Sequence, residues 1–307
     1  MNPKRMVLPF RAMSATSEAP AAYRNTAGNA GAIRLIREGI ADIRSRRRLV
    51  RYLVSADMRR RGADTLLGNF WWVLDPLLQM GVYVVLVTLI ARGQGIPDYP
   101  LFIFAAILPW KWFTASVTDA TSSVASQDRL IKQIQFPKIV LPVAATTAGV
   151  VGFAFGLVPL AGLMLFHIDR VTPFVLLIPV IAAVQFVFTL ALALLVSAGN
   201  VFFRDLRNVV GHVLRLWFYL SPGLYSLSVL DAVRIFDQYP VLRTIIESNP
   251  FAVLFEAYRT VIYGTLDGPP TWPDFSQLAV LTVASLAFLA LAIVVFKRLE
   301  PNFAKVM

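Results

Sequence analysis

The 307-residue chain contains no cysteine and only two histidines, His167 and His212. Without cysteine there are no disulfides and no thiolate ligands, and two histidines so far apart in sequence argue against a His-based zinc site. Charged residues are scarce as well, at 15% of the chain against about 25% in an average soluble domain. The composition therefore excludes a disulfide framework and indicates a membrane protein.

Motifs of nucleotide binding and hydrolysis are also missing. The chain has no G-x-x-x-x-G-K-[ST], no H-E-x-x-H, no G-x-S-x-G and no nucleotide-binding G-x-G-x-x-G, so it carries no P-loop of its own. Carboxylates in or near the apolar runs are few: Asp75 lies in the first run and Asp119 near the inner end of the second. Ion-driven carriers usually place ionisable groups near the bilayer midplane, so this scarcity weakens that class without excluding it. The few acids in short loops argue more strongly against a membrane glycosyltransferase.

Long apolar segments dominate what is present, since 57% of the residues are hydrophobic. Each segment approaches or exceeds the roughly 20 residues that cross a bilayer as a helix. We therefore predict an all-α membrane protein with six transmembrane helices. The six runs are Leu66–Ile90, Leu101–Val117, Ile139–Phe166, Val171–Ser197, Val209–Leu230 and Leu278–Phe296.

The basic residues predict the orientation. Most of the 29 Lys and Arg side chains precede the first run, follow the last run, or lie in the loops 118–138 and 198–208. Because such residues concentrate on the cytoplasmic side, both termini are expected inside the cytoplasmic membrane. Lys111 is an exception within the second run. It either faces a polar cavity, which avoids an insertion cost of about 2.5–3.5 kcal/mol, or snorkels to the headgroups from a short span.

Two further segments flank the spans. Residues 1–30 lack periodicity and are expected to be a disordered tail. Residues 31–61 place isoleucines at helical spacing and arginines mostly on other faces, which favours an amphipathic helix in the membrane surface over a soluble helix packed on a partner. The six-span domain then covers 62–307.

Residues 221–277, on the predicted outer side, are too apolar for a solvated loop. VLRTIIES (241–248) and FAVLFEAYRTVIYG (251–264) are two short helical runs joined by Asn249-Pro250, and neither can span alone. We predict a re-entrant helical hairpin buried in protein, the alternative being an interfacial hairpin without function. Gly152 and Gly156 form a G-x-x-x-G, which permits close helix packing.

The segment SQDRLIKQIQFPKIVLP (126–142) lies between two spans. Ser126 is a candidate N-cap, and Pro137 forbids continuation of the helix. The short amphipathic helix between them is too short to be stable alone. Either a membrane surface or a docking groove on another protein must hold it.

Six segments together resemble ABC-type polysaccharide-export permeases. LIKQIQFPKIVLPVA (130–144) is similar to the family's L-I-K-x-x-x-F-P-x-x-x-L-P signature. The order is collinear over roughly 50–307, and Asp75 stands where the family often has Asn before proline. The other segments are RRRGADTLLGNFWWVLDPLLQM (59–80), YPLFIFAAILPWKWF (99–113), NVFFRDLRNVV (200–210), SPGLYSL (221–227) and NPFAVLFEAYRTVIYG (249–264).

The resemblance implies a permease that acts as a homodimer with two copies of a separate ABC ATPase. It implies export of a polyprenyl-linked glycan such as O-antigen, capsule, teichoic acid or galactan. ATP and Mg would bind the partner, with no cofactor on this chain and no nucleic acid. The residues implied to couple to the ATPase are Asp128, Arg129, Leu130, Ile131, Lys132, Ile134, Phe136, Pro137, Arg204, Asp205 and Arg207.

Candidate residues of the translocation path and outer gate are less specific. Arg59, Arg60 and Arg61 are expected either to hold a pyrophosphate or to anchor the chain to the inner leaflet. Aromatic side chains are expected to line the path or to form interface belts. The path candidates are Trp71, Trp72, Tyr83, Trp110, Lys111, Trp112, Trp217 and Tyr219; the gate candidates are Asn249, Pro250, Glu256 and Arg259. The alternatives are a drug- or lipid-exporting permease of the same architecture and an ion-driven transporter.

Overall fold

The computed structural model describes residues 31–62, 66–90, 96–127, 131, 133, 135–227, 239–265 and 268–306. These residues form helices and turns, and no strand occurs among them. The predicted all-α class is therefore confirmed for this part of the chain. The predicted tail, residues 1–30, lies outside the described residues.

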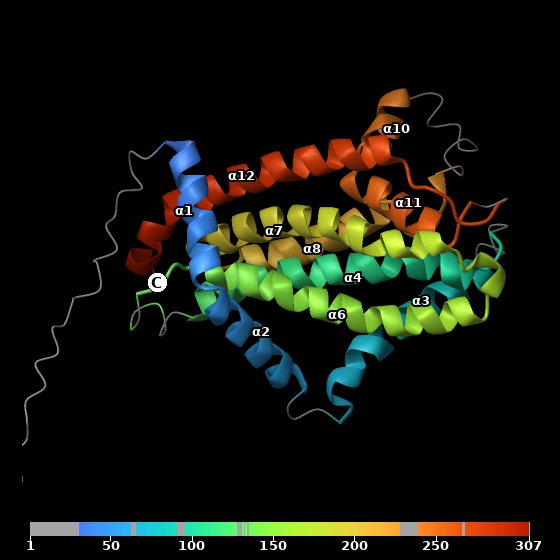
Figure 1. The fold of residues 1–307 in the computed structure, drawn as a ribbon, viewed down its shortest axis with the longest axis horizontal. Helices are drawn as coiled ribbons and strands as arrows, with labels where there is room; N and C mark the ends of the chain where they lie inside the picture. Colours follow the sequence, from blue (N-terminus) through green and yellow to red (C-terminus); the bar gives the residue numbers. More distant parts are fainter. Residues whose placement is uncertain are drawn as a thin grey trace, which may run out of the picture.

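Five helices are long and apolar enough to cross a membrane within the described ranges. Four of them, α4, α6, α7 and α12, run side by side along the long axis of the molecule (Figure 1). Five of the six predicted runs therefore correspond to helices that are long and apolar enough to cross a membrane. The helices are α3 (Trp71–Ile90), α4 (Tyr99–Ser123), α6 (Val140–Leu165), α7 (Ile178–Phe202) and α12 (Phe275–Val306).

The remaining run, Val209–Leu230, corresponds in part to α8 (Leu206–Leu220). This helix has 15 residues, about 22 Å at 1.5 Å per residue, which is less than the roughly 30 Å of bilayer hydrocarbon. The helix ends at Ser221-Pro222, where the chain turns and Pro222 offers no N–H to continue it. The count of six spans stays a prediction.

The predicted single helix over 31–61 is two helices, α1 (Ala32–Ser45) and α2 (Arg47–Gly62), with a bend at Arg46. Helix α1 crosses one end of the bundle, called here the α1 end, and α2 continues along the bundle at a different angle (Figure 1). The bend is needed because α1 packs on α12 while α2 packs on α6. Two predicted face residues, Ile33 and Ile40, point outward and are 70% and 54% exposed.

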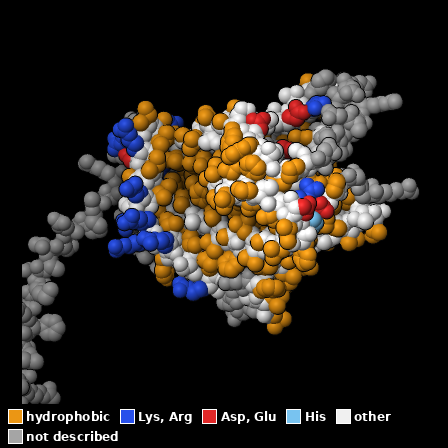
Figure 2. Space-filling view, turned by 45° about the vertical axis from the view of Figure 1, so that its right-hand side comes forward, with side chains coloured by type: hydrophobic (Ala, Val, Ile, Leu, Met, Phe, Trp, Pro, Cys, Tyr) orange, Lys and Arg blue, Asp and Glu red, His pale blue; other side chains and the backbone are white. Residues whose placement is uncertain are grey.

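The buried side chains form two clusters. The larger one surrounds α4, whose residues from Leu101 to Trp110 are all buried. The smaller one lies at the α1 end and includes Val50, Ile139 and Phe296. The outside of the bundle is mostly apolar, and Lys and Arg side chains gather at the α1 end (Figure 2), as expected for a membrane protein with one basic face.

The predicted helical hairpin is present as α10 (Pro240–Glu247) and α11 (Pro250–Ile262). Helix α11 is largely buried and packs against α4, α7 and α12, at the end of the bundle opposite α1 (Figure 1), called here the α11 end. Helix α10 is mostly exposed. The hairpin therefore inserts one helix and leaves the other outside, and its re-entrant position in a membrane stays a prediction.

Close packing of α6 against α4 uses one glycine of the predicted pair, Gly156, together with Gly149 instead of Gly152. A Cβ on Gly149 would lie 2.0 Å from Ser116 Oγ, and one on Gly156 would lie 2.1 Å from Leu108 Cδ1. A Cβ on Gly152 would meet nothing within 4 Å. Gly149 and Gly156 are seven residues apart and both face α4, because seven residues bring a helix back to nearly the same face.

Candidate functional site

Two adjoining cavities form a groove between α2, α3, α4 and α6. The first, of about 220 Å³, lies at the α1 end, and the second, of about 180 Å³, continues along α3, α4 and α6. They share Arg61 and Asp119. Charged and hydroxyl side chains line the groove, although the surface of the bundle is mostly apolar.

Arg61 closes the junction between the two cavities. Its Nε bonds to Asp57 Oδ2 of α2 at 2.6 Å, and its Nη2 bonds to Asp119 Oδ2 of α4 at 2.5 Å. Burial lowers the pKa of the Arg61 guanidinium, but the charges and hydrogen bonds of the two carboxylates raise it by more, so its pKa lies above its ordinary value. Arg61 therefore stays charged and ties α2 to α4.

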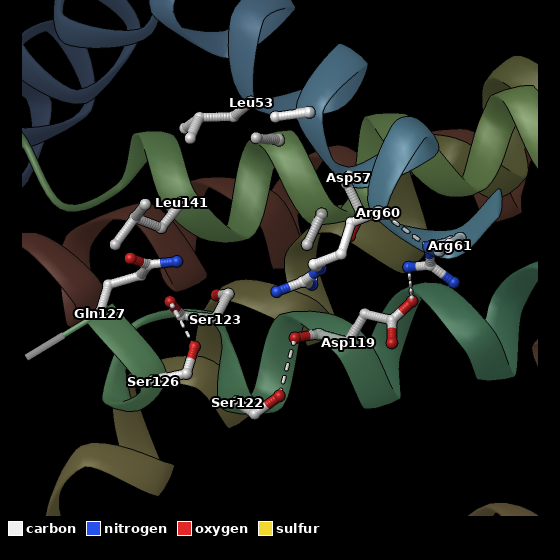
Figure 3. A pocket seen from close by; sticks show the side chains of 13 residues that line it. Leu53, Asp57, Arg60, Arg61, Asp119, Ser122, Ser123, Ser126, Gln127 and Leu141 are labelled. Carbon is white, nitrogen blue, oxygen red and sulfur yellow. Dashed lines mark hydrogen bonds and ion pairs between the residues drawn. The ribbon is translucent and has the colours of Figure 1, made fainter. Parts of the chain in front are cut away.

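The other two arginines of this cluster are more available to a ligand. Arg59 and Arg60 are exposed, although Arg60 bonds to Asp57 at 3.0 Å. Arg60 extends across the first cavity, opposite Ser122, Ser123 and Gln127 (Figure 3). An arginine facing hydroxyl and amide groups can hold a phosphate oxygen. Arg60 therefore presents an exposed side chain to the first cavity, whereas the guanidinium of Arg61 is paired with two carboxylates within the protein.

Lys111 lies in the second cavity and forms an ion pair with Asp75 of α3. The Lys111 side chain is 27% exposed and that of Asp75 is 59% exposed. Of the two interpretations of Lys111 drawn from the sequence, the structure favours the polar cavity over snorkelling. The pair also explains Asp75, because each charge offsets the cost of placing the other among apolar helices.

The structure separates the predicted aromatic residues into two groups. Trp110 and Trp112 are 5% and 3% exposed, and Trp110 packs edge-on against Phe251 of α11 with a centroid distance of 4.6 Å. Trp217 donates its Nε1–H to Asn249 Oδ1 at 3.0 Å. Trp110 therefore lies in the interior, Trp217 is partly buried, and Trp112 lines the second cavity of the groove. Trp71, Trp72, Tyr83 and Tyr219 retain partial or full exposure.

Helix α8 carries a polar stripe that the sequence reading missed. Asn208, His212, Arg215 and Tyr219 are all exposed, and their spacing of four, three and four residues places them on one face. Tyr83 of α3 packs against the buried Phe218 of α8 with a centroid distance of 5.8 Å and hydrogen-bonds to Tyr219, so the Tyr219 end of the stripe adjoins α3. The spacing in the sequence could have indicated that these residues share one face of a helix. Only the tertiary structure shows that the other helices leave this face exposed.

At the α11 end, the predicted gate residues hold the hairpin in place. Asn249 caps α11 by accepting the N–H of Phe251 at 3.0 Å, and it donates to Ser221 Oγ at 2.7 Å, while Pro250 forms the first turn of α11. Arg259 is 2% exposed and donates to the carbonyls of Pro222, Gly223, Tyr225 and Phe102 at 2.7, 2.6, 3.2 and 3.4 Å. Its hydrogen bonds thus go to main-chain carbonyls rather than to Glu256, the acidic gate candidate one turn earlier in α11.

Glu256 instead lines a third cavity, of about 680 Å³, between the hairpin and α12. A group of three or more His, Asp or Glu side chains that could bind a metal ion is absent from the described residues.

Comparison with known proteins identifies the family. No protein-family model matches the chain. The O-antigen export system permease protein RfbA of Myxococcus xanthus is 33% identical over 273 residues, which make up 89% of this chain and 99% of that protein. The chain belongs to the O-antigen export permease family. Two proteins of the same name from Klebsiella pneumoniae are 28% and 26% identical over 259 and 257 residues, each covering 83% of this chain and 93% of the relative.

In this export permease, the α1 end carries the segments predicted to contact an ATPase. Asp128, Arg129, Leu130, Lys132 and Ile134 lie outside the described residues. Ile131 is 7% exposed and belongs to the smaller hydrophobic cluster, against which Phe136 packs, and Pro137 is buried.

Arg204, Asp205 and Arg207, where α7 ends and α8 begins, are exposed, as a docking surface requires. The neighbouring Phe203 is 69% exposed. The sequence did not indicate this surface position, because Phe203 follows an apolar run and resembles its last residue.

Proposed function

We propose that this chain is the permease subunit of an ATP-driven exporter that moves a lipid-linked polysaccharide of the O-antigen class across the cytoplasmic membrane. Its family membership supports the class of substrate. The observation that carries the mechanism is the charged groove, in which the pairs Arg61–Asp119 and Lys111–Asp75 make a polar passage beside α3 and α4. Such a groove offers charged and hydrogen-bonding groups to a hydroxyl-rich, phosphate-bearing molecule.

Arg60 is the proposed contact for the phosphate between lipid and glycan. A polyprenyl chain can stay in the bilayer beside the exposed apolar face of α3, which includes Leu78, Val82 and Leu89, while the phosphate enters the first cavity. Arg59 stays at the surface, where positive charge attracts an anionic headgroup. The termini and this cavity are on the cytoplasmic side in this proposal, in agreement with the basic residues at the α1 end.

The active unit is proposed to be a homodimer, because one copy leaves polar groups of α8 uncovered. An arginine facing lipid at mid-depth costs about 2.5–3.5 kcal/mol on insertion scales. A second copy that faces the stripe containing His212 and Arg215 would place these groups along an aqueous path. Exposed Tyr219 would then offer an aromatic surface on which sugars stack.

Two copies of a separate ATPase are proposed to supply the energy. Segment 126–137 is the proposed coupling helix, and the exposed Arg204, Asp205 and Arg207 form the proposed second contact. The short α8 and the inserted α11 complete a six-span permease whose re-entrant hairpin closes the outer mouth. ATP and Mg bind the partner in this scheme.

Deletion of the gene, followed by analysis of surface and lipid-linked glycan, tests the proposed function. We expect loss of surface polymer and accumulation of lipid-linked polymer inside the cell, with recovery on complementation by the wild-type gene. Complementation with Arg60→Glu should restore the protein in the membrane but not surface polymer, whereas Arg37→Glu, an exposed site on α1, should restore both. Normal surface glycan in the deletion strain would contradict the proposal and favour a drug or lipid substrate.

A further inference from the structure

An ionic triad of buried Lys297, buried Glu300 and half-buried Asp42 joins three parts of the chain at the α1 end. Lys297 of α12 is 3% exposed and lies 2.8 Å from Asp42 Oδ2 of α1 and 2.6 Å from Glu300 Oε2. Glu300 is 1% exposed, and its other oxygen accepts the backbone N–H of Lys138 at 2.5 Å. Lys138 directly follows Pro137, at the end of segment 126–137. One continuous set of polar contacts therefore links α1, α12 and the end of that segment.

The packing around the triad is tight. A Cβ on Gly39 of α1 would lie 2.6 Å from Ile293 Cγ2 of α12 and 3.5 Å from Ile139 Cδ1. Ile139 is fully buried, and it belongs to the same hydrophobic cluster as Phe296. The triad thus lies within the core of the α1 end, where a displacement of one partner forces the others to move or to lose their contacts.

Stability alone does not account for three charged groups at this position. Apolar side chains of similar volume often stabilise a core as well as a buried ion pair does, because desolvation offsets much of the attraction. Charged hydrogen bonds differ in being directional, so they fix one register between their partners. Here they select the register among α1, α12 and Lys138.

We infer that Asp42, Lys297 and Glu300 are positioning residues that couple segment 126–137 to α1 and α12, an inference that rests on the proposed function. The segment lies between α4 and α6 in the chain, so its movement acts on those helices directly. Through Glu300 the same movement reaches α12, which packs along α7, and through Lys297 it reaches α1. The triad thereby lets one contact with an ATPase move helices on both sides of the bundle.

The first test uses the complete permease–ATPase complex in proteoliposomes. The variant Asp42→Asn/Lys297→Met/Glu300→Gln removes all three charges together, so none of the three keeps its charge after losing its partners within the triad. We expect ATP hydrolysis to persist while glycan export per ATP falls about tenfold, a loss in the range of typical coupling free energies. The matched control Arg34→Met/Glu38→Gln removes the exposed ion pair of 2.8 Å on α1 and should leave the ratio unchanged.

A purely structural role predicts a different result, in which hydrolysis and export fall together with the amount of assembled complex. That result, or an unchanged ratio of export to hydrolysis, would overturn the inference. If the wild-type complex exports no glycan on addition of ATP, the proposed function itself is wrong. The next measurement then tests, without transport, whether the triad couples the segment to α1.

The second test measures a distance and needs no transport. Because the chain has no cysteine, spin labels attach only at introduced sites, and Arg37→Cys on α1 with Gln135→Cys gives two exposed positions. With the native triad we expect one narrow distance distribution, unchanged by ATP and the ATPase. Neutralising the triad should broaden it. The same distribution with and without the triad would show that the triad does not couple the two elements.

Discussion

At the scale of single residues, the charged side chains inside the bundle each have a specific partner. Lys111 meets Asp75, and Arg61 meets Asp57 and Asp119. Arg259 differs, because its donors go to four main-chain carbonyls and its guanidinium lies 3.8 Å from the centroid of the Phe102 ring. Carbonyl dipoles and an aromatic face thus take the place of a carboxylate.

We expect Arg259→Met to lower the stability of the protein by about 3–5 kcal/mol, because it leaves buried carbonyls without donors. Arg259→Lys keeps the charge but loses the fork geometry, so its loss should be intermediate. Thermal unfolding in detergent measures both. Arg243→Met on exposed α10 is the control, because a surface ion pair such as Arg243–Glu247 contributes about 0–1 kcal/mol. Equal melting temperatures for Arg259→Met and the control would contradict this role.

At the scale of elements, the two faces of α6 have different tasks. One face, at Gly149 and Gly156, touches α4 so closely that a side chain would overlap Ser116 or Leu108. The other, at Gly152, has open space where a side chain would lie and lines the second cavity of the groove, which Gly149 also borders. The same helix therefore holds the bundle together and forms a wall of the proposed path.

These faces make a matched pair of substitutions three residues apart. Gly149→Val should cost about 1–3 kcal/mol by overpacking and lower the melting temperature. Gly152→Val should leave the melting temperature unchanged but narrow the groove, so that export of glycan falls while the protein remains folded. Thermal unfolding and surface-glycan analysis of both variants provide the check. Similar stability and similar export in the two variants would show that the faces are not distinct.

At the scale of the whole molecule, the exposed surface differs between α8 and α12. Helix α12 exposes only apolar side chains along its middle, such as Val280 and Val283, which are 71% and 67% exposed, and these fit lipid. Helix α8 exposes the polar side chains of His212 and Arg215 beside Leu216. His212 and Arg215 do not fit a lipid surface. This asymmetry favours α8 as the face that meets a second copy.

Cross-linking in native membranes tests this arrangement, since the chain has no cysteine of its own. A short cysteine cross-linker should produce dimers of Leu216→Cys, or of its neighbours Val213→Cys and Leu220→Cys, because these side chains are 65%, 51% and 65% exposed on α8. Val283→Cys on α12 is equally exposed and should stay monomeric. Dimers of Val283→Cys, with none from α8, would place the contact on the opposite side.

The sequence by itself determined the class of this protein, five of its long apolar helices and its family. Those features depend on local patterns, such as apolar runs of about 20 residues, the basic segments between them, and the L-I-K-x-x-x-F-P motif. The sequence also placed the hairpin at 241–264, because Asn249-Pro250 marks a helix start on the chain itself.

The partners of the charged residues were decided only by the tertiary structure. Asp42 and Lys297, or Arg61 and Asp119, are far apart in the chain, so no spacing connects them. The same holds for the tryptophans, since burial of Trp110 and Trp112 depends on how α4 packs against α6, α7 and α11. The bend at Arg46 is likewise a result of packing, because α1 and α2 contact different helices. Local patterns fix which segments become helices, and long-range contacts fix which faces become interior, groove or surface.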